Sequence, residues 1–107
     1  MIQVIYHRQY NRVTVNGHAG SGPEGHDLVC SAASALALTL AGNVHHLQAR
    51  GIVRDVITDL TEGNAEVQCT PTSRYKATAA MIYQAVCVGF ELLATKYPEN
   101  ISYEVIG

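Results

Sequence analysis

Residues 27–47, DLVCSAASALALTLAGNVHHL, form a long stretch dominated by apolar side chains. Val29, Leu36 and Leu40 belong to a series that recurs every three or four residues, which predicts a helix with one apolar stripe. Leu28 and other apolar residues also make the opposite side apolar. We therefore expect this helix to be buried centrally or against a second subunit.

Alternating apolar and polar residues predict strands on both sides of this helix. The strands are expected around Val4 and Tyr6, around Val13 and Val15, over residues 52–57 and 65–69, and over residues 101–105 at the end of the chain. Tight turns are expected at residues 9–11 and 61–64. A second helix is expected over residues 79–97, and Pro98 ends it.

The expected order is ββαββαβ, without repeats or linkers. We predict an α+β fold with two layers, in which two long helices lie against one largely antiparallel sheet of about five strands. Residues 1–107 form a single domain. One face of such a sheet is left uncovered in a monomer, and a homodimer would bury it.

Composition and charge exclude several classes of protein. The hydrophobic fraction of 48% and the charged fraction of 15% are those of a folded domain rather than a disordered one. The net charge is −2 and the seven Lys and Arg residues are scattered, so we expect no direct nucleic-acid binding. We find no apolar run of membrane-spanning length and no signal peptide, and therefore expect a cytoplasmic protein without membrane contact.

The chain has three cysteines, Cys30, Cys69 and Cys87, with wide spacing and no CxxC pair. An odd number in this arrangement fits neither a disulfide framework nor a structural zinc site. Cys69 falls in a predicted strand and Cys87 in the apolar stripe of the second helix, so both are interpreted as core residues. Cys30 is the thiol for which a chemical role remains to be considered.

Residues 20–25, GSGPEG, match the dinucleotide-binding pattern GxGxxG between a strand and a helix. The context does not fit that function, because the preceding strand belongs to a hairpin and Pro23 removes one backbone donor. Asp27, interpreted as the N-cap of the helix, also places negative charge where a pyrophosphate would bind. We expect no nucleotide and no other cofactor.

A second interpretation is a metal site built from His18, His26, Asp27 and Cys30, which are all acceptable zinc ligands. Their spacing matches none of the common zinc motifs, and the glycines between them would make the site entropically costly to assemble. We expect no metal.

A third interpretation is a cysteine nucleophile with a histidine base. If Asp27 caps the helix, Cys30 lies in its first turn, where the helix dipole and unpaired N–H groups favour a thiolate and offer oxyanion donors. His18, at the end of the second strand, would be the general base if the fold brings its imidazole to the sulfur. The alternative that Cys30 is merely packed in an apolar helix stays open at this point.

Other residues of this segment have supporting roles in the same interpretation. Gly20, Gly22 and Gly25 would form a flexible loop between the base and the nucleophile, as an active-site lid requires. Ser34 lies one turn after Cys30 on the same helix face.

The segment resembles the bacterial ribosomal-processing cysteine protease family called Prp. The resemblance rests on Gly17-His18-Ala19 and on residues 25–36, GHDLVCSAASAL, and it extends over the whole chain, including residues 96–98, KYP, and the final strand. Two small departures are Ser31 and Ala33 in a run that is usually Cys-Ala-Ala-Val-Ser. The loop over residues 20–24 is also poorer in bulky side chains than is usual in the family.

The resemblance implies a homodimeric cysteine endopeptidase that removes the N-terminal extension of a large-subunit ribosomal protein during ribosome assembly. It implies cleavage after bulky hydrophobic or aromatic residues. By motif position, Cys30 would be the nucleophile and His18 the base, with Gly17, Asp27 and Ser34 as supporting residues. The alternatives are a non-catalytic dimeric module for ribosome assembly or peptide binding, and a zinc hydrolase.

Overall fold

The computed structural model describes residues 1–18, 24–61 and 63–107, with the backbone alone for residues 24–27. The expected order ββαββαβ is confirmed. The elements are β1 (Ile2–His7), the 3-10 turn η1 (Arg8–Tyr10), β2 (Arg12–Asn16), α1 (Glu24–Ala49), β3 (Val53–Thr61), β4 (Asn64–Pro71), the 3-10 turn η2 (Ser73–Tyr75), α2 (Lys76–Lys96) and β5 (Ile101–Ile106).

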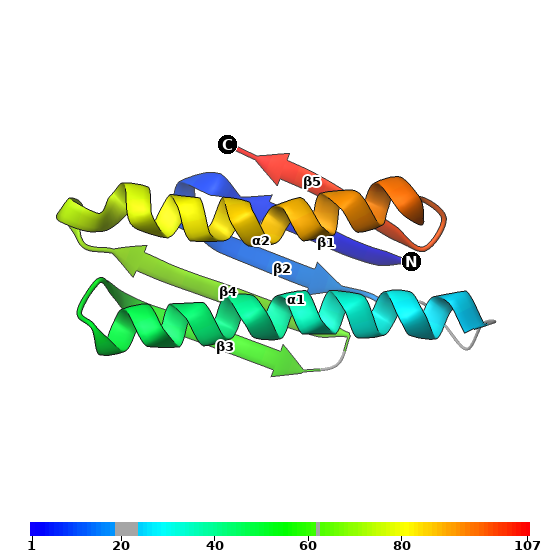
Figure 1. The fold of residues 1–107 in the computed structure, drawn as a ribbon, viewed down its shortest axis with the longest axis horizontal. Helices are drawn as coiled ribbons and strands as arrows, with labels where there is room; N and C mark the ends of the chain where they lie inside the picture. The colour runs from blue at the N-terminus through cyan, green and yellow to red at the C-terminus, as the bar shows by residue number, and fades with distance from the viewer. Residues whose placement is uncertain (19–23, 62) are drawn as a thin grey trace.

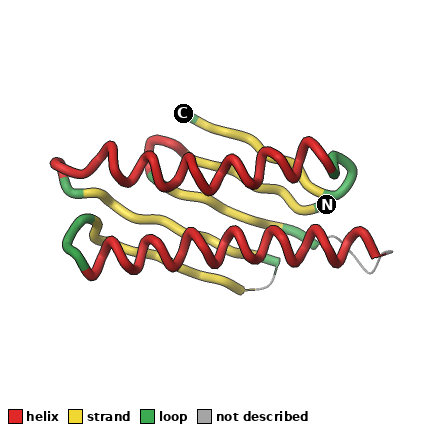
Figure 2. The backbone as a smooth tube through the Cα atoms, viewed as in Figure 1, coloured by secondary structure: helices red, strands yellow, loops and turns green. Residues whose placement is uncertain are grey.

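The strands form one sheet in the order β3-β4-β2-β1-β5. The pairs β1–β2, β2–β4 and β3–β4 are antiparallel, whereas β5 runs parallel to β1 because the chain returns to the sheet through the long crossover of α2. Both helices lie on the same side of the sheet, with α1 packed on β3 and β4 and α2 packed on β5 (Figures 1 and 2). The predicted two-layer α+β architecture with a largely antiparallel sheet is confirmed.

The core lies between the sheet and the two helices, and strand alternation determines which side chains enter it. Val4 and Tyr6 of β1 stand opposite Val15 and Val13 of β2 on the helix side. The helices complete the core with the fully buried side chains Leu40, Val44, Tyr83 and Phe90.

The opposite face of the sheet carries mainly polar side chains. Thr14 stands beside Glu66, which stands beside Asp59, and Arg12 binds Glu66 through its Nε at 3.1 Å from Oε2. The expectation that one face of the sheet is left uncovered in the monomer is confirmed, and that face is mainly polar.

Several exposed large apolar side chains lie on the helices. Leu28 of α1 and Met81, Val88 and Leu92 of α2 are each more than half exposed. Helix α1 is thus buried along one stripe rather than on all sides.

Two helical segments meet the length and mean hydropathy of a membrane span, although polar residues interrupt both. Residues 28–49 and residues 73–96 are long and apolar enough by length and composition, with mean hydropathies of 1.4 and 1.5. In this fold each helix packs a buried stripe on the sheet. Many small residues, alanine above all, raise the mean hydropathy without forming a run of large apolar side chains.

Helix α1 ends in a hydrogen-bonded turn that delivers the chain to β3. The Ile52 N–H donates to the Leu47 carbonyl at 2.9 Å and the Gly51 N–H donates to the Gln48 carbonyl at 3.0 Å. Gly51 has a φ of +72°, the left-handed conformation that such a helix end requires. Open space surrounds the position that a side chain of Gly51 would occupy.

Candidate active site

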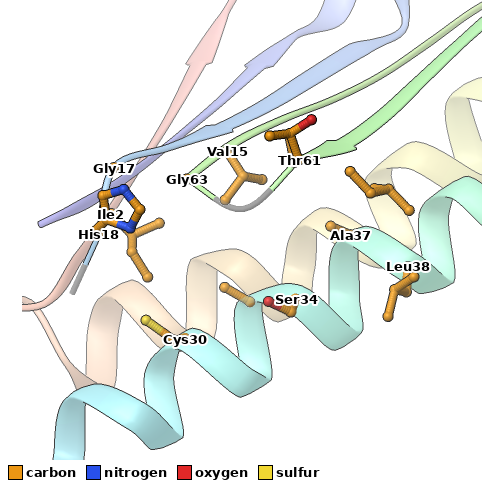
Figure 3. Close-up of a pocket in the computed structure, with 13 residues that line it drawn as sticks. Ile2, Val15, Gly17, His18, Cys30, Ser34, Ala37, Leu38, Thr61 and Gly63 are labelled. Carbon is orange, nitrogen blue, oxygen red and sulfur yellow. The ribbon is translucent and has the colours of Figure 1, made fainter. Parts of the chain in front are cut away.

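A pocket of about 360 Å³ lies between α1 and the end of the sheet where β2 stops and β3 turns into β4 (Figure 3). Most of the wall formed by the described residues is apolar, and none of these lining residues is acidic. The lining residues are Ile2, Val15, Gly17, His18, Cys30, Ala33, Ser34, Ala37, Leu38, Leu60, Thr61, Gly63 and Ala65. Strand alternation explains this composition, because Val15, Ala65 and Leu60 stand in one row on the helix side of the sheet.

Helix α1 supplies the sulfur of this site. The Cys30 thiol is half-buried and lies on the pocket wall, and Ser34, one helical turn later, lines the same pocket (Figure 3). The neighbouring positions 33 and 37 carry only alanine methyl groups. These small apolar side chains leave space in the pocket beside the thiol.

His18 reaches the pocket from the sheet side, directly after β2. Figure 3 shows its imidazole and the Cys30 sulfur facing the pocket from opposite walls. Two main-chain hydrogen bonds fix this part of the backbone: the Gly17 N–H donates to the Gly63 carbonyl at 3.0 Å, and the Met1 nitrogen donates to the His18 carbonyl at 2.9 Å.

Gly17 itself is required by the local geometry. Its φ is +103°, and a Cβ at this position would clash with the carbonyl oxygen of Met1. Both facts exclude an ordinary side chain at position 17. Gly17 thus lets the chain pass close to Met1, and His18 then places its imidazole at the pocket.

The structure therefore brings together four of the predicted site residues in one pocket, namely Gly17, His18, Cys30 and Ser34. The Asp27 side chain, Gly20 and Gly22 lie outside the described residues. Gly25 lies in the first turn of α1 and not in the preceding loop.

The predicted N-cap is wrong. Helix α1 begins at Glu24, so Asp27 lies inside the helix and Cys30 lies beyond the first turn. The dipole effect and the unpaired N–H groups are confined to that turn, and they do not extend to Cys30. An acidic residue such as Glu24 is favourable at a helix start. The prediction relied on the spacing of larger apolar residues and did not use this preference.

The other two thiols are in the core, as predicted. Cys69 and Cys87 are 1% and 3% exposed. Burial raises the pKa of Cys69, and it raises the pKa of Cys87 to about 11. Both thiols are therefore protonated and sealed at neutral pH, and they are poor nucleophiles.

The zinc interpretation involves side chains of which only His18 and Cys30 are described. Within residues 1–18, 28–61 and 63–107, no three His, Cys, Asp or Glu side chains gather in a way that could hold a metal ion.

Residues from the β3–β4 hairpin complete the pocket, and the sequence pattern did not identify them as part of a site. Leu60, Thr61 and Gly63 lie on its wall, although residues 61–64 indicated no more than a turn. Gly63 has a φ of +80°, and the glycine in this turn was the signal available in the sequence.

Comparisons with known proteins show the family and the fold of this chain. The model of the family described as cysteine protease Prp matches residues 1–102. The ribosomal processing cysteine protease Prp of Staphylococcus aureus is 32% identical over 90 residues, which cover 83% of this chain and 80% of that protein.

Solved structures show the same fold. The essential ribosomal processing protease Prp from S. aureus, in complex with a covalently linked product peptide, matches with a TM-score of 0.70 and 25% identity over 98% of this chain and 97% of that one. SMU.848 from Streptococcus mutans matches with a TM-score of 0.70 and 26% identity over 99% and 94% of the two chains. The chain described here therefore belongs to the Prp family of cysteine proteases.

Proposed function

We propose that this protein is a cysteine endopeptidase in which Cys30 is the nucleophile and His18 the general base. The observation that carries the proposal is that a thiol from α1 and an imidazole from the end of β2 line one pocket from opposite walls. Cysteine and histidine in such an arrangement are the pair that nucleophilic acyl transfer requires. Because Cys69 and Cys87 are buried, Cys30 is the most accessible of the three thiols.

The reaction follows the chemistry of these two groups. His18 takes the thiol proton as the Cys30 sulfur attacks the scissile carbonyl carbon, and a C–S bond forms. The C–N bond then breaks, and the imidazolium returns the proton to the leaving amine. Water, deprotonated by His18, attacks the thioester, and collapse of this second adduct releases the carboxylic acid and regenerates the thiol.

We propose as substrate the N-terminal extension of a large-subunit ribosomal protein. The S. aureus relative is named for ribosomal processing, and its solved complex holds a covalently linked product peptide. In this chain the apolar wall built by Val15, Leu38 and Leu60 favours a bulky apolar side chain next to the scissile bond. Such a substrate places the enzyme in the cytoplasm, where ribosomal proteins are made.

We also propose that the protein is a homodimer. The exposed Met81, Val88 and Leu92 on α2 support it, because large apolar side chains exposed on one helix are candidates for burial in an interface. Sedimentation should give a mass of twice 11.5 kDa, and Val88→Glu should halve it. A wild-type chain that sediments as a monomer at high concentration would contradict the homodimer.

The catalytic proposal is tested with a synthetic peptide that carries the ribosomal extension. Cys30→Ala and His18→Ala are each expected to lower kcat/KM by about 10³-fold or more, and the double variant should be little worse than either, because the two groups act as one unit. Undiminished cleavage by Cys30→Ala or His18→Ala would disprove the dyad. A wild-type protein that binds the peptide without cutting it would favour the non-catalytic peptide-binding module.

A further inference from the structure

The imidazole of His18 occupies the space in which any other residue at position 63 would place its side chain. A Cβ built on Gly63 would lie 2.5 Å from Cε1 and 2.6 Å from Nε2 of His18, and 3.4 Å from Nδ1. Real Cβ atoms do not approach heavy atoms at the two shorter distances. The edge of the ring formed by Cε1 and Nε2 therefore rests directly on the main chain of the β3–β4 turn.

The same turn also holds the backbone from which the imidazole projects. The carbonyl of Gly63 accepts a hydrogen bond from the N–H of Gly17, the residue before His18. Beyond these residues the pairing continues in register from Asn16, opposite Asn64, into β2 and β4. One residue of the turn thus contacts the ring and fixes its main-chain attachment.

Among the described residues, no polar group restrains the His18 side chain. The residue is exposed, and no hydrogen bond from its ring to another described residue is present. A ring with an exposed side chain samples several rotamers unless packing selects one. Contact with Gly63 limits this freedom on one side of the pocket.

We propose that Gly63 is a positioning residue for the general base: the absence of a side chain there creates the seat that holds the His18 imidazole facing Cys30. This inference rests on the proposed function, and it adds a residue that lies far along the chain from both members of the dyad. A methyl group at position 63 would displace the ring from this seat. Even a small displacement of a catalytic group lowers the rate, because the reacting atoms are no longer aligned.

The test compares Gly63→Ala with Gly51→Ala. Both glycines have positive φ, +80° and +72°, so alanine suffers similar backbone strain at either position. Open space surrounds the Cβ position of Gly51, whereas that of Gly63 meets His18. The second variant therefore controls for strain without the clash.

We expect Gly63→Ala to lower kcat on the order of 10²-fold with KM nearly unchanged. Gly51→Ala should keep kcat within about threefold of the wild type. NMR signals of the His18 ring should move in Gly63→Ala and stay in place in Gly51→Ala. This last readout needs no substrate, so the seat can be tested even if the protease assignment fails.

A double variant keeps the test decisive if Gly63→Ala alone is poorly folded. Replacing His18 by alanine removes the ring, so the loss of thermal stability that Gly63→Ala shows in excess of Gly51→Ala should disappear in the His18→Ala background. Unchanged His18 signals in Gly63→Ala would overturn the proposal, as would an excess loss of stability that persists without the ring. Equal kcat for the two glycine variants would overturn it as well.

Discussion

The three cysteines of this chain occupy two opposite kinds of environment. Cys69 and Cys87 lie in the sealed layer between helices and sheet, and burial raises the pKa of both thiols. Cys30 lies on the wall of an open pocket with an imidazole on the other side. A cysteine is therefore not reactive by residue type alone. Its reactivity depends on whether a substrate can reach the thiol and on whether a base lies nearby.

The core thiols also share their environment with buried phenols. The Tyr83 hydroxyl donates to the Val67 carbonyl at 3.2 Å, and burial raises the pKa values of Tyr83 and Tyr103 far above the usual range. These groups are held neutral where charge would be costly. At the pocket, by contrast, the side chains of His18 and Cys30 are more exposed and less tightly packed.

Matched alanine substitutions should separate the two environments most clearly. Cys30→Ala is expected to lose about 10³-fold or more in cleavage while changing the free energy of unfolding by only about 0.5 kcal/mol. Cys69→Ala should keep cleavage nearly intact and cost about 1–2 kcal/mol, because its sulfur is replaced by a small cavity. Peptide cleavage and urea unfolding measure both effects. If both variants lost activity to the same degree, the division would be wrong.

Alkaline pH should sharpen the comparison with a smaller effect. An unfolded thiol loses its proton near pH 9.0, whereas folded Cys87 keeps it until about pH 11. Between these values the unfolded chain binds fewer protons, so the free energy of unfolding falls as pH rises, by about 1–3 kcal/mol from this group, and it is independent of this group below pH 9.

Unfolding curves of the wild type and Cys87→Ala between pH 8 and 11 check this expectation. Removal of the thiol should flatten the decline, even though the variant starts from a lower stability. Cys30→Ala serves as the control for a thiol outside the core. An identical decline in wild type and Cys87→Ala would show that burial does not hold the Cys87 proton.

Much of the fold could be predicted from the sequence. Apolar periodicity identified both helices and all strands in the correct order, because one buried face per element leaves a regular pattern. The placement of Cys69 and Cys87 in the core followed from the same pattern. Gly17, His18, Cys30 and Ser34 were also identified, by chemistry and by resemblance, and the structure brings them to one pocket.

The start of α1 and the part of the pocket formed by the β3–β4 turn could not be predicted from apolar periodicity. Glu24 and Gly25 belong to the helix without contributing large apolar residues, so periodicity placed the start too late. The contact between Gly63 and His18 joins the β3–β4 turn to the residues after β2, and it depends on a missing side chain. Such contacts leave no periodic signal within a single segment.

The central claim is that one thiol of three, Cys30, carries the chemistry, and site-resolved alkylation tests it most directly. Native protein is treated with iodoacetamide, and both the labelled cysteine and the remaining peptide cleavage are followed over time by mass spectrometry. We predict that label appears on Cys30, that Cys69 and Cys87 stay unlabelled until the chain is unfolded, and that cleavage falls in proportion to labelled Cys30. Protein fully labelled at Cys30 that still cleaves at the normal rate would contradict the account.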